Sequence, residues 1–279
     1  NLKDETGKEI VRAALQNDIN FIDTAYMYGP EKSEILIGEV LKETGQRSNV
    51  VLATKGGQKY MNDKMEVDNS PKFLRETVEN SLRRLQTDYI DLFYIHFPDE
   101  QTPKYEAVGE LHRLKEEGKI RSIGVSNFSM DQLREGNKDG YIEVIQSGYN
   151  LFKRDAEDDL IPYSLENNIS FIPYFPLASG LLTGKFSPNS TFEDGRAKNP
   201  LFQGEAFIQN LNKVDELKAI ANNKHVAVSN LVLAWYLKQE SIDVVIPGAK
   251  KPEQVLENIK TLEIKLSKDE INEISKIFH

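Results

Sequence analysis

The chain alternates short, almost entirely apolar segments with stretches whose apolar residues recur at helical spacing. Seven of the apolar segments are typical of buried β-strands, because they are short and rich in β-branched or aromatic residues. They span residues 19–24, 50–55, 89–96, 120–126, 144–149, 170–175 and 244–247. Such alternation indicates βα units, whose strands form a parallel sheet covered by helices. It therefore restricts the chain to α/β folds.

Helical patterns occupy much of the sequence between these segments. The clearest span residues 71–85, 105–115, 229–237 and 267–277, and residues 1–17 also read as a helix. Ser229 is the expected N-cap of the third pattern, and Ser267 with Glu270 forms the capping-box signature of the fourth. The longest irregular stretch, residues 178–204, is rich in Gly, Pro, Asn and Asp. A loop of that length inside a compact domain is often functional.

Seven strands in a chain of 279 residues predict a (β/α)8 TIM barrel, a fold of about 250 residues. A doubly wound open sheet is the alternative fold. No Gly-x-Gly-x-x-Gly turn follows any predicted strand, which argues against a Rossmann dinucleotide domain. Because the chain opens on a helix, we expect the first barrel strand to be missing from this sequence. We interpret residues 1–279 as one barrel domain that is incomplete at its N-terminus.

Composition excludes several classes of function. The formal net charge of −9 argues against broad binding to nucleic acids or anionic membranes. With no cysteine, the chain has neither disulfides nor thiolate catalysis nor Cys-based metal sites. Its four histidines show no clustered ligand spacing, so we expect no metal. No apolar run approaches the length of a membrane span.

Polar residues close most of the predicted strands. In a (β/α)8 barrel the carboxyl ends of the strands meet at the active-site face, so these side chains are expected to gather there. One polar residue at a strand end is weak evidence, whereas six strands ending this way indicate a site. The residues are Asp23, Lys55, His96, Ser126 with Asn127, Gln146 and Tyr174.

Two tyrosines follow Asp23 in the segment FIDTAYMYG, and either can supply a proton. A lysine ammonium nearby stabilises the phenolate and lowers the pKa of a tyrosine, which makes the hydroxyl a usable general acid. Asp23 would keep Lys55 charged, and His96 would orient a carbonyl oxygen. Gly29 allows a sharp turn behind Tyr28, which only weakly favours Tyr28 over Tyr26. A Schiff-base role for Lys55, as in aldolases, is the chemical alternative.

Seven motifs along the chain resemble those of the aldo-keto reductases, in the order in which that family carries them. They are DTAYMYG from Asp23, LATKGG around Lys55, YIHFPD around His96, GVSNF from Gly124, QSGYN from Gln146, PLASGLLTGKF from Pro176 and IPGAKKPEQVLENI from Ile246. The resemblance runs from about Ile10 to the C-terminus and favours bacterial NADP-dependent members of the general-stress or inositol-operon type. A Schiff-base aldolase has no need of the set formed by Ser126, Asn127 and Gln146.

The resemblance implies a (β/α)8 barrel that reduces aldehydes or ketones with NADPH. It makes Tyr28 the proton donor, with Asp23, Lys55 and His96 completing a catalytic tetrad. Ser126, Asn127 and Gln146 would hold the nicotinamide carboxamide, and Tyr174 would stack on the ring. The remaining NADP(H)-binding residues implied are Leu177, Gly180 and Lys185 at the pyrophosphate, and Gly248, Lys250, Gln254, Glu257 and Asn258 at the adenosine end.

Compared with the family pattern, we expect the N-terminal hairpin and the first strand to be missing from this sequence. Some positions also depart from that pattern. Phe97 follows His96 where many members carry Trp, and Gln254 stands where many NADPH-specific members carry Arg. Lys250 and Lys251 can supply the cations that a 2′-phosphate needs instead. The resemblance also implies a cytoplasmic protein whose partner is a small carbonyl compound. A cofactor-binding regulatory subunit of the same fold, with little turnover, is the alternative function.

Overall fold

The computed structural model describes residues 3–61 and 64–279, which form two compact units. The first unit contains the described part of Asn1–Ser147, together with Ala156–Ile172 and Ala249–Leu256. The second contains Gly148–Asp155, Pro173–Gly248 and Glu257–His279. Within the described ranges, no helix combines the length and the apolar character needed to cross a membrane.

A six-stranded sheet with the order β1-β2-β5-β6-β7-β8 organises the first unit. The strands are β1 (Phe21–Asp23), β2 (Val51–Gly56), β5 (Ile90–Ile95), β6 (Ile120–Ser126), β7 (Val144–Gly148) and β8 (Ser170–Tyr174). The paired strands from β1 to β7 run parallel, as predicted. Six of the seven predicted strands are therefore confirmed, with ends that shift by at most two residues.

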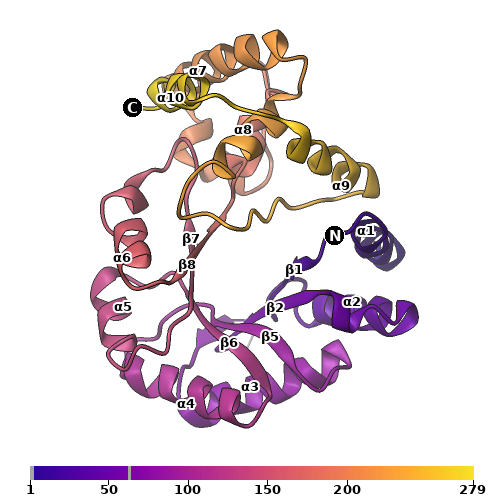
Figure 1. Cartoon of the computed structure of the whole chain (residues 1–279), viewed down its shortest axis with the longest axis vertical. Coiled ribbons are helices and arrows are strands. Elements are labelled where there is room, and N and C mark those ends of the chain that lie inside the picture. Colours follow the sequence, from indigo (N-terminus) through magenta and orange to yellow (C-terminus); the bar gives the residue numbers. More distant parts are fainter. Residues whose placement is uncertain (1–2, 62–63) are drawn as a thin grey trace. The chain divides into compact units, whose positions relative to one another are not determined.

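Helices cover the sheet from α1 (Asp4–Gln16) to α6 (Leu160–Glu166). Between them come α2 (Lys32–Thr44), α3 (Pro71–Leu85), α4 (Lys104–Glu116) and α5 (Met130–Gly136). Figure 1 shows α2, α3, α4 and α5 following one another along one side of the curved sheet. The expected helix at residues 1–17 is α1, and the first two residues of that expectation lie outside the described residues.

The agreement is closest where local signals and packing coincide. Helix α3 begins and ends where its apolar spacing predicts, with Pro71 in the first turn and the Ser70 hydroxyl accepting a hydrogen bond from the Phe73 amide. Its buried residues include Leu74 and Val78, which lie one helical turn apart on one face. Amphipathic spacing and capping therefore favour the same helix.

A short hairpin formed by β3 (Gln58–Met61) and β4 (Lys64–Val67) follows β2. Sequence analysis did not predict it. Both strands have only four residues and alternate poorly, and they pair with each other rather than with the main sheet. Tyr60 and Met61 are exposed on this hairpin.

The second unit contains α7 (Gly204–Asn223), α8 (Val228–Tyr236) and α10 (Lys268–Ile277), and α9 (Pro252–Ile259) begins in the first unit and ends in the second. The capping box of Ser267 and Glu270 at the start of α10 is confirmed. The N-cap predicted at Ser229 is wrong, because α8 begins at Val228 and Ala227 occupies the N-cap position. Helix α8 is buried over almost its whole length, so tertiary packing rather than a capping side chain sets its start.

The strand predicted at residues 244–247 is also wrong, since these residues have no assigned secondary structure. Val244, Val245 and Ile246 are only half-buried, and Pro247 offers no amide hydrogen to a sheet. Apolar composition alone therefore does not make this segment a strand.

The long segment of residues 178–204 is more ordered than its composition suggests. It contains three short 3-10 helices, Ala178–Thr183, Gly195–Lys198 and Pro200–Phe202. Phe186 and Phe192 lie edge to face with ring centroids 5.1 Å apart, and Phe192 makes a similar contact with Phe202 at 4.9 Å. Aromatic packing of this kind gives the segment a small core of its own.

Prediction for Asp91, at the beginning of β5: replacing it by Ala should lower the free energy of unfolding by about 2 kcal/mol. The Asp91 carboxylate is an ion-pair partner of Arg47 at 2.8 Å and of Arg121 at 3.0 Å, and it accepts a hydrogen bond from the Leu52 amide. Chemical denaturation measures the change. Asp215→Ala, at an exposed helical position, is the control and should change the same quantity by less than about 0.5 kcal/mol. Equal effects would show that the Asp91 cluster does not stabilise the sheet.

Candidate functional site

The ammonium of Lys55 forms the centre of the site. Lys55, the last residue but one of β2, is fully buried, and its Nζ is paired with the Asp23 carboxylate at the end of β1. The same Nζ donates a hydrogen bond to the carbonyl oxygen of Thr24 at 3.0 Å. Burial lowers the pKa of Lys55, and Asp23 opposes that shift by stabilising the ammonium. The ion pair is therefore shielded from water, and its charges act strongly on neighbouring groups.

Asp23 is fixed from a second side by Gln146. The Gln146 Nε2 atom donates a hydrogen bond to Asp23 Oδ2 at 2.9 Å, while Lys55 holds the other carboxylate oxygen. Gln146 lies on β7 and is almost completely buried. Strands that are far apart in the sequence thus bring an amide, a carboxylate and an ammonium into one hydrogen-bonded line.

The structure separates the two tyrosines that sequence analysis could barely distinguish. The Tyr28 ring centroid lies 5.2 Å from Lys55 Nζ, and the side chain is 44% exposed. The Tyr26 ring instead lies under the guanidinium of Arg84, 5.3 Å from its centre. Only Tyr28 therefore combines contact with the buried ammonium and access from outside.

His96 follows β5 and faces Tyr28 edge-on, with ring centroids 6.1 Å apart. Burial lowers the pKa of His96 to about 3, and the charge of Lys55 adds to this shift. Phe97 stacks on the imidazole at 4.7 Å. The His96 side chain is therefore neutral at physiological pH, and its ring is held in place by an aromatic neighbour.

Ser126 and Asn127 complete the set in the first unit. Asn127 has a positive φ of 60°, which is uncommon for a residue with a side chain. Its Nδ2 donates hydrogen bonds to the His96 carbonyl oxygen at 2.9 Å and to Ser126 Oγ at 3.0 Å. Asn127 therefore connects the end of β6 to the segment that carries His96.

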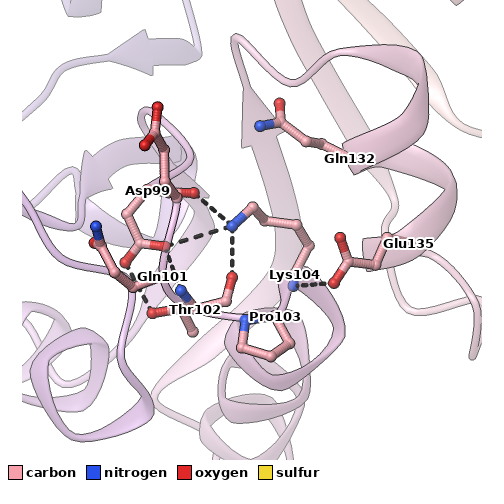
Figure 2. A pocket seen from close by; sticks show the side chains of 8 residues that line it. Asp99, Gln101, Thr102, Pro103, Lys104, Gln132 and Glu135 are labelled. Carbon is pink, nitrogen blue, oxygen red and sulfur yellow. Dashed lines mark hydrogen bonds and ion pairs between the residues drawn. The ribbon is translucent and has the colours of Figure 1, made fainter.

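The loop after His96 is anchored by Asp99. The Asp99 carboxylate accepts a hydrogen bond from the Asn69 amide at 2.7 Å, and the Asp99 amide donates to Asn69 Oδ1 at 2.8 Å. A hollow of about 460 Å³ lies beside Lys104. Figure 2 shows the Lys104 ammonium directed at Asp99 and Thr102. Because these groups engage the Lys104 ammonium, we interpret the hollow as part of the anchor of this loop.

The other predicted cofactor residues are divided between the units. Tyr174, Leu177, Gly180, Lys185, Gly248, Glu257 and Asn258 belong to the second unit, and Lys250 and Gln254 belong to the first. Within the second unit, the Tyr174 and Phe175 rings meet edge to face at 5.2 Å, and the Glu257 carboxylate is paired with Lys260 at 2.6 Å. In the first unit, Gln254 Oε1 accepts a hydrogen bond from the Lys250 amide at 2.7 Å.

Sequence analysis overlooked one neighbour of the site, Tyr94. It is fully buried, and its ring centroid lies 5.5 Å from Lys55 Nζ. A signal was available in the sequence, because Tyr94 stands two positions before His96 and alternate residues of a strand share a face. Instead, the whole apolar run before His96 was interpreted as core.

Comparisons with known proteins indicate a single family. The profile of the aldo/keto reductase family matches residues 1–278. The aldo-keto reductase YhdN of Bacillus subtilis (strain 168) is 40% identical over 255 residues, which are 90% of this chain and 77% of that protein. The NADH-specific methylglyoxal reductase of Escherichia coli (strain K12) is 36% identical over 262 residues, 89% and 80% of the respective chains.

Solved structures lead to the same family. The glycerol dehydrogenase AKR11B4 from Gluconobacter oxydans matches with a TM-score of 0.93 and 36% identity, covering 98% of this chain and 85% of that one. An aldo/keto reductase from Klebsiella pneumoniae, solved with NADP and acetate, matches with a TM-score of 0.75 and 28% identity over 98% and 86% of the two chains. These similarities confirm the resemblance indicated by the motifs and the predicted barrel class.

Prediction for His96: its imidazole should remain neutral between pH 5 and 8. Its pKa of about 3 lies far below the value of 6.5 for an exposed histidine. NMR titration of the imidazole carbon-bound protons measures this, with the His96→Asn variant identifying the signal. His112, His225 and His279 provide internal controls. A midpoint near pH 6 for His96 would contradict the burial argument.

The same shift has a consequence for stability. The unfolded chain binds a proton on His96 below about pH 6.5, whereas the folded chain binds it only near pH 3. The contribution of His96 to stability is therefore complete above pH 6.5 and is lost as the pH falls towards 3.

Proposed function

Because the chain belongs to the aldo/keto reductase family, we propose that it reduces aldehydes or ketones to alcohols with NADPH as the hydride donor. The observation that carries this proposal is the exposed Tyr28 side chain, whose ring lies 5.2 Å from the ammonium of the buried Lys55–Asp23 ion pair. We treat residues 1–279 as one reductase domain, since the family profile covers residues 1–278. The catalytic residues proposed are Asp23, Tyr28, Lys55 and His96.

The residues present fit a nicotinamide dinucleotide. Ala178, Ser179 and Gly180 all have positive φ values, of 46°, 54° and 93°, and form a tight left-handed turn. A side chain at Gly180 would place its Cβ atom 3.3 Å from the Nζ atom of Lys185. A turn this close to an ammonium suits a pyrophosphate, which backbone amides and a cation together stabilise. When bound, the nicotinamide supplies the hydride that reduces the carbonyl carbon.

Tyr28 donates the proton that the carbonyl oxygen needs once the carbon has been reduced. The Lys55 ammonium stabilises the phenolate that Tyr28 becomes, because opposite charges attract strongly in a site with little water. Asp23 keeps Lys55 oriented, and Gln146 keeps Asp23 oriented. Proton donation by Tyr28 therefore depends on a line of three buried groups.

His96 orients the carbonyl oxygen as a neutral donor. Its Nδ1 atom is buried and makes no hydrogen bond to a described residue. A proton on Nδ1 would be a buried donor without an acceptor, so the Nε2–H tautomer is favoured. We assign the Nε2–H group to the carbonyl oxygen of the substrate.

Recognition of the nicotinamide carboxamide is assigned to Ser126, Asn127 and Gln146. The amide nitrogens of Asn127 and Gln146 already donate within the protein. Each amide oxygen has two lone pairs and can accept a hydrogen bond from the carboxamide nitrogen. These residues would therefore accept hydrogen bonds from the carboxamide nitrogen. Tyr174 would stack on the ring.

NADPH rather than NADH is proposed because of Lys250 and Lys251. Both side chains are exposed just before α9, where the implied adenosine site lies. Gln254 is turned back to the Lys250 amide, so the phosphate would be held by lysine alone. The relatives differ in this respect, since one is named NADH-specific and another was solved with NADP.

Prediction for Tyr28: the Tyr28→Phe variant should lose at least about 100-fold in kcat, the usual contribution of a general acid. NADPH affinity should change by less than about twofold, because removing one hydroxyl leaves the proposed cofactor residues intact. Loss of NADPH absorbance with a panel of reactive aldehydes measures kcat, and fluorescence titration measures binding.

Tyr26→Phe is the matched control, since the Tyr26 ring faces Arg84 and should retain full turnover. Loss of NADPH binding in Tyr28→Phe would make Tyr28 structural. Tight NADPH binding without turnover in the unaltered protein would favour the regulatory-subunit alternative.

Prediction for cofactor choice: Lys250→Ala should weaken NADPH binding about tenfold, because one charge-assisted contact to the 2′-phosphate is lost. NADH binding should change by less than about twofold. Lys265→Ala, at another exposed lysine, is the control for a general loss of positive charge. Equal weakening of both cofactors by Lys250→Ala would remove Lys250 from the phosphate site.

A further inference from the structure

Tyr94 lies on the inner side of the Lys55 ammonium. Lys55 on β2 is paired in register with Tyr94 on β5, so the two side chains leave the same face of the sheet. The Tyr94 ring is completely buried, and its centroid lies 5.5 Å from Lys55 Nζ. The ammonium therefore contacts two tyrosine rings, that of exposed Tyr28 and that of buried Tyr94.

Gly124 provides the space for this ring. Tyr94 is paired in register with Gly124 on β6. A Cβ atom at Gly124 would lie 2.3 Å from Tyr94 Cδ1 and 2.6 Å from Cε1, closer than any real contact. The position of the ring thus depends on glycine at residue 124, and the two residues form one packing unit.

The Tyr94 hydroxyl group stays neutral. Its oxygen is buried and makes no hydrogen bond of ordinary geometry to a described residue. Burial raises the pKa of Tyr94 well above its ordinary value, and the Asp23 carboxylate adds to the shift while Gln146 acts in the opposite sense. Tyr94 therefore presents the electron-rich face of an uncharged ring to Lys55, an arrangement that favours a cation.

We propose that Tyr94 is a positioning residue: its ring, seated on Gly124, holds the Lys55 ammonium against Asp23 and keeps water from the ammonium's inner side, so that its charge acts on Tyr28. The titratable groups around Lys55 are Asp23, Tyr28, Tyr94 and His96. This inference rests on the proposed reductase function only for its kinetic consequences. Its electrostatic consequence is independent of turnover.

The first experiment compares Tyr94→Leu with Tyr94→Phe. Leucine removes the ring and leaves space lined by the polar groups of Lys55, Asp23 and Gln146, which water can fill. Water in that space screens the charge of the ammonium and weakens its effect on Tyr28. The ionisation of Tyr28 therefore moves to higher pH. Phenylalanine keeps the ring and should leave the ionisation unchanged.

NMR of protein labelled at the Cζ carbon of tyrosine measures this ionisation directly, without cofactor or substrate. The Tyr28→Phe variant identifies the Tyr28 signal. In Tyr94→Leu the midpoint should rise by about half a pH unit or more, which corresponds to the lower end of the range of cation–π energies. Phe93→Leu is the matched control, because Phe93 is equally buried on the same strand but points to the opposite face.

Kinetics provide the second readout. Tyr94→Leu should lower kcat about tenfold and shift the pH limb of kcat in the same direction as the NMR midpoint, with KM nearly unchanged. In Tyr94→Phe, kcat and its pH limb should equal those of the unaltered protein. A role of Tyr94 in packing alone would lower thermal stability in Tyr94→Leu and in Phe93→Leu alike, without moving the NMR midpoint in either.

The glycine supplies an independent test. Gly124→Ala should displace the Tyr94 ring and raise the NMR midpoint, whereas Gly109→Ala, where a Cβ atom meets nothing within 4 Å, should not. In the Tyr94→Leu background, Gly124→Ala should add little, because the ring that it would displace is gone. Additive effects of the two substitutions would overturn the inference.

Failure of this inference and failure of the proposed function give different results. An unaltered protein without turnover overturns the reductase proposal but leaves the NMR comparison valid. An unchanged Tyr28 midpoint in folded Tyr94→Leu overturns the role of Tyr94, whatever the turnover.

Discussion

The ion pair between Lys55 and Asp23 is the interaction on which the rest of the site depends. An ammonium and a carboxylate with almost no exposure are unfavourable unless each is paired and hydrogen-bonded. The structure meets that requirement with the Thr24 carbonyl oxygen and the Gln146 amide. What remains is a positive charge whose interactions are little weakened by water. Burial and that charge together keep His96 neutral, and the charge makes Tyr28 a suitable acid.

The parallel sheet is what makes such a pair possible. Asp23 and Lys55 end neighbouring strands, and Gln146 joins them from a strand 123 residues further along the chain. No local segment can satisfy the buried charges by itself, so the pair is favourable only when β1, β2 and β7 are all in place. The strand pairings that form the sheet therefore also assemble the site. A substitution that disrupts the strand pairing also disrupts the site, and the reverse holds as well.

Secondary structure was predictable where local and tertiary preferences agree. Strand β6 and helix α3 have the predicted bounds, because a continuous apolar run and a capped amphipathic pattern each favour one structure. Residues 244–247 and the N-cap at Ser229 were predicted wrongly, because strand pairing and helix burial are tertiary properties. The hairpin of β3 and β4 escaped notice because its strands have only four residues each and alternate poorly.

The site was predictable in its residue types but not in its contacts. A carboxylate, a lysine and a histidine at strand ends stand out against apolar neighbours, whereas Tyr94 is hidden inside an apolar run. Yet the register that places Tyr94 between Lys55 and Gly124 follows from strand order and the two-residue repeat of a strand. A buried aromatic residue two positions before a strand-end histidine, opposite a glycine on the next strand, is thus a pattern that sequence can display. The role of the aromatic residue can be inferred only when the charge beside it is known to be buried.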